Sequence, residues 1–369
     1  MKISEYVSLG HPDKIADYIS EYILDSFILR DPNVRYAVEV QIKDNHVSLA
    51  GELTTTASAL TTEEWHLLVE RALEEIGYTQ EYCNKWGTEN TIDPSKLTVD
   101  VYISTQSPDI AQGVNNDGWG DQGIFWGMAC HETPDMLPLD YVLAKRLGDA
   151  LYENARVGAA PWGLDIKTQF VLSDLNKVQK IIVAAPCKEA DLDRLKQYVT
   201  DWTVHQVCQK LDNRAPEIII NGTGAYIKHA SIGDCGTTGR KLAVDFYGGN
   251  CRIGGGCPWT KDPTKADLTL NLAARILAID SLHIYNINTA YVSIGCCIGR
   301  PEIDITVYDG LNTVMHSQTI KKTPTELIKG LELKSPIYAK MCRWGMWDYI
   351  DNVRKGKQNG QTEEETSGR

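Results

Sequence analysis

Amphipathic helices followed by paired strand-forming runs recur along this chain, and this alternation limits the folds that it can adopt. Large apolar residues occur at every fourth position from Ile15 to Phe27, which predicts an amphipathic helix over 14–29. Two runs of strand-forming residues follow, Arg35–Lys43 and His46–Thr54, and the Asp-Asn pair between them predicts a β-hairpin.

Similar elements follow further along the chain. Thr61 and Glu64 form a capping-box pattern that starts a second helix. The other expected helices cover 141–152, 191–211 and 268–282, and the other expected strands cover 97–104, 167–172, 178–184, 217–220, 241–246, 290–298 and 302–307. The pattern predicts an α+β protein of three similar units.

We place the three units at residues 1–108, 109–228 and 229–353. The segment 354–369 contains no aliphatic or aromatic residue, so it cannot contribute to a packed core and we expect it to be disordered.

The charge balance argues against two classes of partner. Lys and Arg number 37 against 49 Asp and Glu, a net charge of −12, and no basic run offsets it, so we expect no nucleic-acid partner. Apolar runs such as Ile181–Ala185 are far shorter than the roughly 20 residues that span a bilayer. We therefore expect no membrane partner, whereas a small anionic ligand is compatible with a few cations in one cleft.

The ten cysteines lack the C-x-x-C spacing of a structural zinc site. They are mostly scattered among apolar stretches, as reduced and buried thiols are. This distribution predicts a cytoplasmic protein.

Two short segments combine glycine with charged side chains. Gly10–Lys14 places a histidine, a carboxylate and an ammonium at a helix N-terminus, where they could hold a phosphate and its metal. The alternative is that Asp13 only caps the helix. Gly118–Gly123 carries Asp121, and by itself this segment indicates a turn.

Two later segments favour polyphosphate binding more strongly. Gly233–Lys241 contains three glycines, an aspartate and two cations, although its spacing is not that of a Walker motif. Residues 254–267 add two lysines and two aspartates, which suggest phosphate plus metal or, alternatively, a solvated charge cluster on a flexible loop. Because the G-x-S-x-G, H-E-x-x-H and kinase motifs are missing, we expect a reaction without an enzymic nucleophile.

Taken in order, these segments resemble the S-adenosylmethionine synthetases, also called methionine adenosyltransferases. The resemblance runs from about residue 4 to residue 345 and is carried by Gly10–Lys14, Gly51–Thr55, Gln106–Ile110, Gly120–Gly123, Gly233–Lys241 and Lys261–Lys265. It implies transfer of the adenosyl group of ATP to the sulfur of L-methionine. The released tripolyphosphate is then hydrolysed to pyrophosphate and phosphate.

The resemblance also implies roles for individual residues. The implied catalytic residues are His11, Lys167, Arg240, Lys241 and Lys261, and the implied ATP site adds Asp165, Tyr226, Asp234 and Cys257. The implied methionine site consists of Glu52, Gln106, Asp121, Asp234 and Lys265, with 106–116 as a covering loop. Asp13 and Asp267 are implied ligands of Mg²⁺, and Glu39 is an implied ligand of K⁺.

The implied architecture is three similar α+β units around a pseudo-threefold axis, with sheets that pair between the subunits of a homo-oligomer and active sites at the interface. The chain departs from the family pattern at Ala225, which stands for an arginine, and at Cys257–Thr260, which stands for a smaller segment. Two alternatives remain at this point. One is a non-catalytic regulatory homologue, and the other is an adenosyltransferase of the same fold for another methionine analogue.

Overall fold

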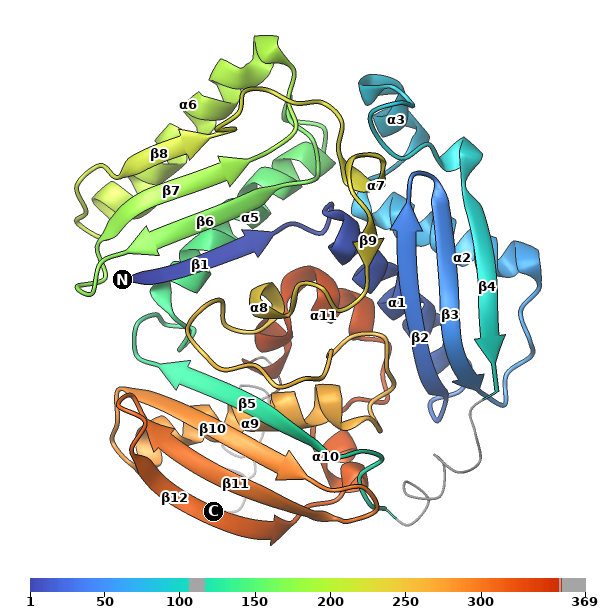
Figure 1. Ribbon diagram of the computed structural model, residues 1–369, viewed down its shortest axis with the longest axis vertical. Coiled ribbons are helices and arrows are strands. Elements are labelled where there is room, and N and C mark those ends of the chain that lie inside the picture. Colours follow the sequence, from blue (N-terminus) through green and yellow to red (C-terminus); the bar gives the residue numbers. More distant parts are fainter. Residues whose placement is uncertain (106–116, 352, 354–369) are drawn as a thin grey trace, which may run out of the picture.

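The computed structural model describes residues 1–105, 117–351 and 353, and these residues form three four-stranded sheets around a common centre (Figure 1). The sheet orders are β1-β6-β7-β8, β4-β3-β2-β9 and β12-β11-β10-β5. The strands are β1 Lys2–Val7, β2 Arg35–Lys43, β3 His46–Thr54, β4 Thr98–Ser104, β5 Gly123–Cys130, β6 Lys167–Leu172, β7 Val178–Ala184, β8 Glu217–Ile220, β9 Gly236–Thr237, β10 Thr289–Cys296, β11 Glu302–Asp309 and β12 Val314–Lys321. The predicted three-unit α+β fold is confirmed.

Each sheet contains one strand from a distant part of the chain. Strand β1 pairs antiparallel with β6, so that Lys2 lies opposite Leu172. Strand β5 pairs with β10, and the two-residue strand β9 pairs with β2. Each of the three ranges proposed from the sequence therefore supplies most of one sheet and contributes one strand to another.

The helices pack against the sheets, and several of them lie toward the centre of the molecule (Figure 1). They are α1 Pro12–Ile28, α2 Thr62–Ile76, α3 Gln80–Trp86, α5 Leu139–Arg156, α6 Leu192–Thr203, α7 Ala230–Gly233, α8 Leu242–Asp245, α9 Ala266–Ile284, α10 Pro324–Gly330 and α11 Tyr338–Trp344. The apolar stripe of α1 is buried, as predicted, and both hydrogen bonds of the capping box at Thr61 and Glu64 are present.

Two predictions of secondary structure were wrong. Residues 241–246 form the short helix α8 instead of a strand, and the Asp245 carboxylate at its end accepts hydrogen bonds from Lys14 and from the Trp259 indole. The helix expected over 191–211 ends as an α-helix at Thr203 and continues as a π-helical turn, Val204–Gln209. The segment 354–369 lies outside the described residues.

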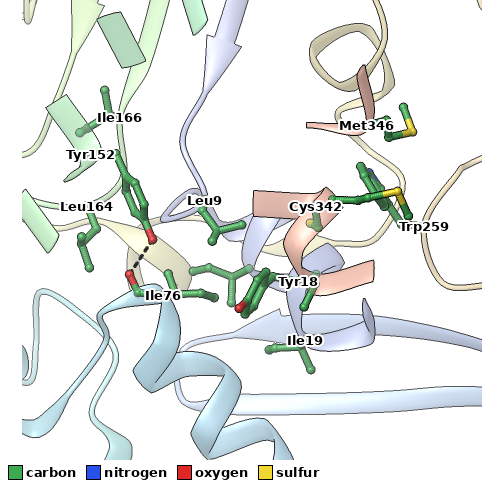
Figure 2. Packing of buried hydrophobic residues seen from close by; sticks show 14 of the residues in the cluster. Leu9, Tyr18, Ile19, Ile76, Tyr152, Leu164, Ile166, Trp259, Cys342 and Met346 are labelled. Atoms are coloured by element: carbon green, nitrogen blue, oxygen red, sulfur yellow. Dashed lines mark hydrogen bonds between the residues drawn. The ribbon is translucent and has the colours of Figure 1, made fainter. Parts of the chain in front are cut away.

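The hydrophobic core is shared by the three units. In Figure 2, Leu9 and Tyr18 lie between Leu164 on one side and Cys342 and Trp259 on the other. The Tyr152 hydroxyl donates to the backbone oxygen of Ile76 at 2.7 Å, which ties α5 to the end of α2. Packing across the units therefore fixes where loops from different parts of the chain meet.

The outer face of the sheet β4-β3-β2-β9 matters most for the site. Alternate residues of β2 from Tyr36 to Ile42 are buried, whereas Glu39 and Gln41 point outward and are exposed. This outer face is where loops from the C-terminal third of the chain reach the sheet.

Two further features bear on the sequence predictions. Each of the ten cysteines is free of disulfide bonding. Within the described residues, we find no helix that combines the length and the apolar character needed to cross a bilayer.

Candidate active site

The N-terminus of α1 presents a neutral histidine. The Nδ1 atom of His11, the N-cap residue, accepts a hydrogen bond from the backbone N–H of Asp13 at 3.2 Å. Burial, and then the positive charges of Lys167 and Lys241, lower the pKa of His11 to about 3. A neutral ring whose Nδ1 accepts a hydrogen bond must carry its proton on Nε2. His11 can therefore donate one hydrogen bond to an anion without adding charge.

Asp13 collects hydrogen bonds from the segment 233–241. Its carboxylate accepts from the backbone N–H of Thr237 at 2.9 Å and from the Lys241 ammonium, and Arg240 Nε lies 3.7 Å from Oδ1. Burial opposes ionisation of Asp13, but the hydrogen bonds from Lys241 and Thr237 outweigh it and lower the pKa of this carboxyl. Asp13 is therefore charged at neutral pH and holds two cations of the glycine-rich segment beside the helix N-terminus.

The residues that lead into β6 complete this first cluster. Asp165 accepts a hydrogen bond from the backbone N–H of Ala230 at 3.1 Å. Burial raises the pKa of Asp165 to about 6, although Lys167 and Lys241 oppose the shift. Asp165 also interacts with Asp234. Burial raises the pKa of Tyr226, and the negative charge of Asp165 raises it further. We define the nucleotide cluster as His11, Asp13, Asp165, Lys167, Tyr226, Asp234, Arg240 and Lys241.

A second cluster lies on the outer face of the sheet. Lys261 forms an isolated antiparallel bridge with Ala37 of β2, and Ala37 is paired in turn with Glu52 of β3. The Lys261 ammonium forms an ion pair with Asp267. Burial lowers the pKa of Lys261, but the charge of Asp267 and its hydrogen bond outweigh burial, so the net shift is upward. Lys261 is therefore a permanent cation at this face.

Gly256 lies against the Asp267 carboxylate, and the absence of a side chain on this glycine leaves space for Asp267. A Cβ atom on Gly256 would lie 1.8 Å from Asp267 Oδ1, so any larger residue would displace the carboxylate. At the neighbouring Gly255, a Cβ atom would meet nothing within 4 Å. Gly256 is thus required for the position of Asp267, whereas Gly255 is not.

Lys265 is fixed by a buried partner. Its ammonium donates to Asp262 at 2.7 Å, and Asp262 is fully buried and also accepts the backbone N–H of Tyr36 at 2.8 Å. Cys257 lies against Gly239 of the neighbouring segment. Burial raises the pKa of Cys257 well above its usual value, so this thiol stays protonated and is a poor nucleophile.

Asp121 lies in the turn that leads into β5, and its charge and that of Asp267 both act on Cys296. Its backbone oxygen accepts a hydrogen bond from the Cys296 thiol at 3.3 Å. Burial, and then the negative charges of Asp121 and Asp267, raise the pKa of Cys296 to about 12. We define the outer-face cluster as Glu39, Glu52, Asp121, Cys257, Lys261, Lys265 and Asp267. Gln106 and the covering loop 106–116 fall outside the described residues.

The segment 233–241 connects the two clusters. Thr238 of this segment donates its hydroxyl hydrogen to Glu39, while Lys241 and Arg240 contact Asp13. Sequence reasoning missed Thr238 and Thr260, because a threonine hydroxyl gives no signal until its acceptor is known.

Lys14 is not available to a phosphate. The sequence motif placed this ammonium with candidate phosphate ligands, but Lys14 is buried between Asp17 at 3.0 Å and Asp245 at 2.6 Å. The Trp259 ring lies 4.8 Å from its ammonium. The spacing of Lys14 and Asp17 on one helix face was the one local signal for this structural role.

Comparison with known proteins agrees with this arrangement. Family models of the S-adenosylmethionine synthetase N-terminal, central and C-terminal domains match residues 1–108, 116–226 and 229–354. The chain belongs to the S-adenosylmethionine synthetase family.

Relatives resemble this family member over nearly its whole length. It is 35% identical to an S-adenosylmethionine synthase of a Nitratiruptor species, over 93% of this chain and 91% of the relative. It is 34% identical to S-adenosylmethionine synthase 1 of Frankia casuarinae, over 93% and 92%. A solved structure described as an unusual S-adenosylmethionine synthetase from Campylobacter jejuni superposes with a TM-score of 0.85 at 29% identity, covering 97% of this chain and 98% of the other.

The side chains present fit the two metal ions that the family implies, Mg²⁺ and K⁺, to different degrees. Among the described residues, no group of three or more His, Cys, Asp or Glu side chains is placed to hold a metal ion. Mg²⁺ is usually bound by one or two carboxylates together with substrate phosphates, and Asp13 and the glycine-cradled Asp267 fit that pattern. Glu39 fits a cation site less well, since each of its carboxylate oxygens already accepts a threonine hydroxyl hydrogen.

Proposed function

We propose that this protein synthesises S-adenosylmethionine from ATP and L-methionine. The sulfur of methionine attacks the ribose C5′ carbon, the C5′–O bond breaks, and tripolyphosphate leaves and is then hydrolysed to pyrophosphate and phosphate. The observation that carries the proposal is the pairing of two carboxylates with two lysines, Asp13 with Lys241 and Asp267 with Lys261. These pairs provide the charges that a tripolyphosphate leaving group requires.

The protonation states of the site agree with this reaction. A thioether sulfur has no proton to lose, so its attack requires no general base. His11 is neutral and Cys257 is a protonated thiol, so neither needs to act as a base or a nucleophile. The contribution of the protein is to position the reactants and to stabilise the developing negative charge.

The phosphate chain is expected to lie among the cations of the two clusters. Lys167, Arg240, Lys241 and Lys261 are the proposed charge partners, with a hydrogen bond from His11 Nε2. Asp13 and Asp267 are the proposed holders of Mg²⁺, which would neutralise phosphate oxygens when bound. His11 and Asp13 are buried, so charge at this end of the site lies in a region of low dielectric constant, where it acts strongly on the leaving group.

The organic parts of the substrates use the remaining residues. We assign the adenosine to Tyr226, Asp165 and Asp234, because Tyr226 offers an aromatic ring near Asp165, and Asp165 and Asp234 are interacting carboxylates that can accept hydrogen bonds from ribose hydroxyls. The methionine carboxylate is assigned to Lys265, and its ammonium to the acids Glu52, Asp121 and Asp234, with Gln106 as an additional polar contact.

We further propose a homo-oligomer whose active sites lie at a subunit interface. Glu39, Asp234, Lys167 and Arg240 are exposed on the single chain. Large apolar side chains are also exposed on two of the sheets, namely Tyr102 on β4, in the same sheet as Glu39, and Ile124 on β5. A second copy of the chain placed against these surfaces would bury both the exposed polar site residues and the exposed apolar side chains. Ten free cysteines agree with a reducing, cytoplasmic location.

Product formation tests the proposal directly. Purified protein incubated with ATP, L-methionine and Mg²⁺ should form S-adenosylmethionine, and Lys261→Ala should reduce the rate by about 10²–10³-fold with the fold intact. Lys180→Ala, which removes a half-buried ammonium on β7 that is paired with Glu217, is the matched control and should keep its rate. If no product formed with methionine or its analogues, the non-catalytic alternative would replace this proposal.

A further inference from the structure

The carboxylate of Glu39 is held on both sides by hydroxyl groups. Thr260 Oγ1 donates to Oε1 at 3.1 Å, and Thr238 Oγ1 donates to Oε2. Both threonines are buried, and Thr238 Oγ1 also accepts the backbone N–H of Val40 at 3.3 Å, so its hydrogen is directed at Glu39. Glu39 is therefore oriented by the chain itself.

Thr260 has an unusual backbone conformation for this role. Its φ angle is +74°, a left-handed value that β-branched residues rarely adopt and that glycine adopts without strain. The conformation is held by a hydrogen bond from Val38 N–H to the Thr260 oxygen at 3.0 Å and by one from Thr260 N–H to Glu21 Oε1 at 2.5 Å. A threonine at a position that suits glycine is explained by its hydroxyl, which reaches Glu39.

The consequence falls on the next residue, Lys261. Its backbone pairs with Ala37, two residues before Glu39 on the same strand. The Lys261 ammonium is attracted first by Asp267 and more weakly by Glu39. Fixing Glu39 and Thr260 together therefore fixes the backbone of Lys261, whose ammonium the proposed reaction places on the tripolyphosphate.

A monovalent cation at Glu39 would perform the same task, because it would neutralise the carboxylate and tie the loop to the strand. We propose that the hydroxyls of Thr238 and Thr260 replace that cation, so that this protein is catalytically independent of K⁺. This inference rests on the proposed function for its rate measurements but not for its stability measurements. Thr238 and Thr260 are positioning residues that act through Glu39 and Lys261.

The experiment compares K⁺ with tetramethylammonium at constant ionic strength and saturating Mg²⁺. The wild-type rate should change by less than about twofold between the two salts. Its melting temperature should differ by less than about 2 °C. A rise in the wild-type rate of about fivefold or more with K⁺ would overturn the proposal. So would a K⁺-specific increase in the melting temperature, even if the preparation formed no S-adenosylmethionine.

Variants test whether the two threonine hydroxyls that bind Glu39, here called the clamp, position the site or are merely structural contacts. Thr260→Gly relieves the backbone strain and removes the hydroxyl, so it should fold, should lose rate in tetramethylammonium and should be partly rescued by K⁺. Its melting temperature should now rise with K⁺. Thr260→Ser keeps the hydroxyl and should stay insensitive to K⁺, while Thr238→Val should behave like Thr260→Gly. Full activity of Thr260→Gly without K⁺ would contradict the role of the clamp.

Discussion

The backbone of Gly256 lies so close to Asp267 that a Cβ atom there would come within 1.8 Å of the carboxylate oxygen Oδ1. A glycine without catalytic atoms therefore determines where a proposed Mg²⁺ ligand and its partner Lys261 are held.

Gly256→Ala should move Asp267 and weaken the use of Mg²⁺. We expect the Mg²⁺ concentration for half-maximal rate to rise by about tenfold or more, as for loss of an orienting contact. The matched control is Gly255→Ala, whose added methyl meets nothing within 4 Å, and its Mg²⁺ dependence should match the wild type. Equal Mg²⁺ dependence for Gly256→Ala would show that Asp267 is not a metal ligand.

Arg240 should matter more for tripolyphosphate than for methionine. It is exposed and lies 3.7 Å from Asp13, within the proposed cation set, while methionine carries one carboxylate that is assigned to Lys265. In Arg240→Leu, hydrolysis of added tripolyphosphate should fall by about tenfold or more, since one charge is lost at the leaving group. The KM for methionine should change by less than about twofold. Arg194→Leu, at a distant exposed ion pair, is the control.

Asp165 should produce an acid limb in the pH profile. Burial raises its pKa to about 6, so it gains a proton as the pH falls below that value. If its carboxylate binds the ribose, kcat/KM for ATP should fall by up to about tenfold per pH unit below this pKa, and Asp165→Asn should lower the plateau and remove the limb.

The same shift predicts a stability effect with a definite sign. Because the folded pKa of Asp165 is raised from 3.8 to about 6, the native state binds more protons than the unfolded chain between these values. The contribution of Asp165 to stability is present at low pH and is lost as the pH rises through about 6. The free energy of unfolding of wild type relative to Asp165→Asn should decrease over that window in denaturant titrations. An unchanged difference would contradict the shift.

Mixed dimers test whether two chains share each site. If His11 of one chain and Lys261 of its partner belong to one site, His11→Ala and Lys261→Ala are each inactive alone. When the two are refolded together, half of the dimers are mixed, and each mixed dimer has one site with both lesions and one with none. Activity should recover to roughly one quarter of wild type if association is random. No recovery, with mixed dimers confirmed by mass, would place both residues in a site made by one chain.

Local patterns predicted the periodic elements well and the exchanged strands poorly. The α1 stripe and the β2–β3 hairpin depend on side chains close in sequence, and both were predicted within a few residues. The short strand β9 and the strand β12, in which only Ile320 is half-buried, lack an alternating apolar pattern, so only their pairing partners define them.

Prediction of the site was limited in the same way, by contacts between residues that are far apart in the sequence. The resemblance supplied charged residues that the fold gathers in two clusters, while their functional roles stay predictions. It could not supply the burial of Lys14, because its partner Asp245 lies 231 residues away. The Thr238–Glu39 contact likewise joins residues 199 positions apart, which no local pattern encodes.

The cyclic exchange of strands among the three sheets also sets an order of events during translation. Strand β1 is synthesised long before its partner β6, which ends at Leu172, so this sheet edge stays unpaired until β6 has emerged. Strand β5 likewise waits for β10, and β2 waits for β9. None of the three sheets can be completed by its own contiguous stretch of nascent chain. The polypeptide therefore cannot fold one unit at a time as each unit emerges, because two sheets wait for β8 and β9, which end at Ile220 and Thr237, and the third waits for β12, which ends at Lys321.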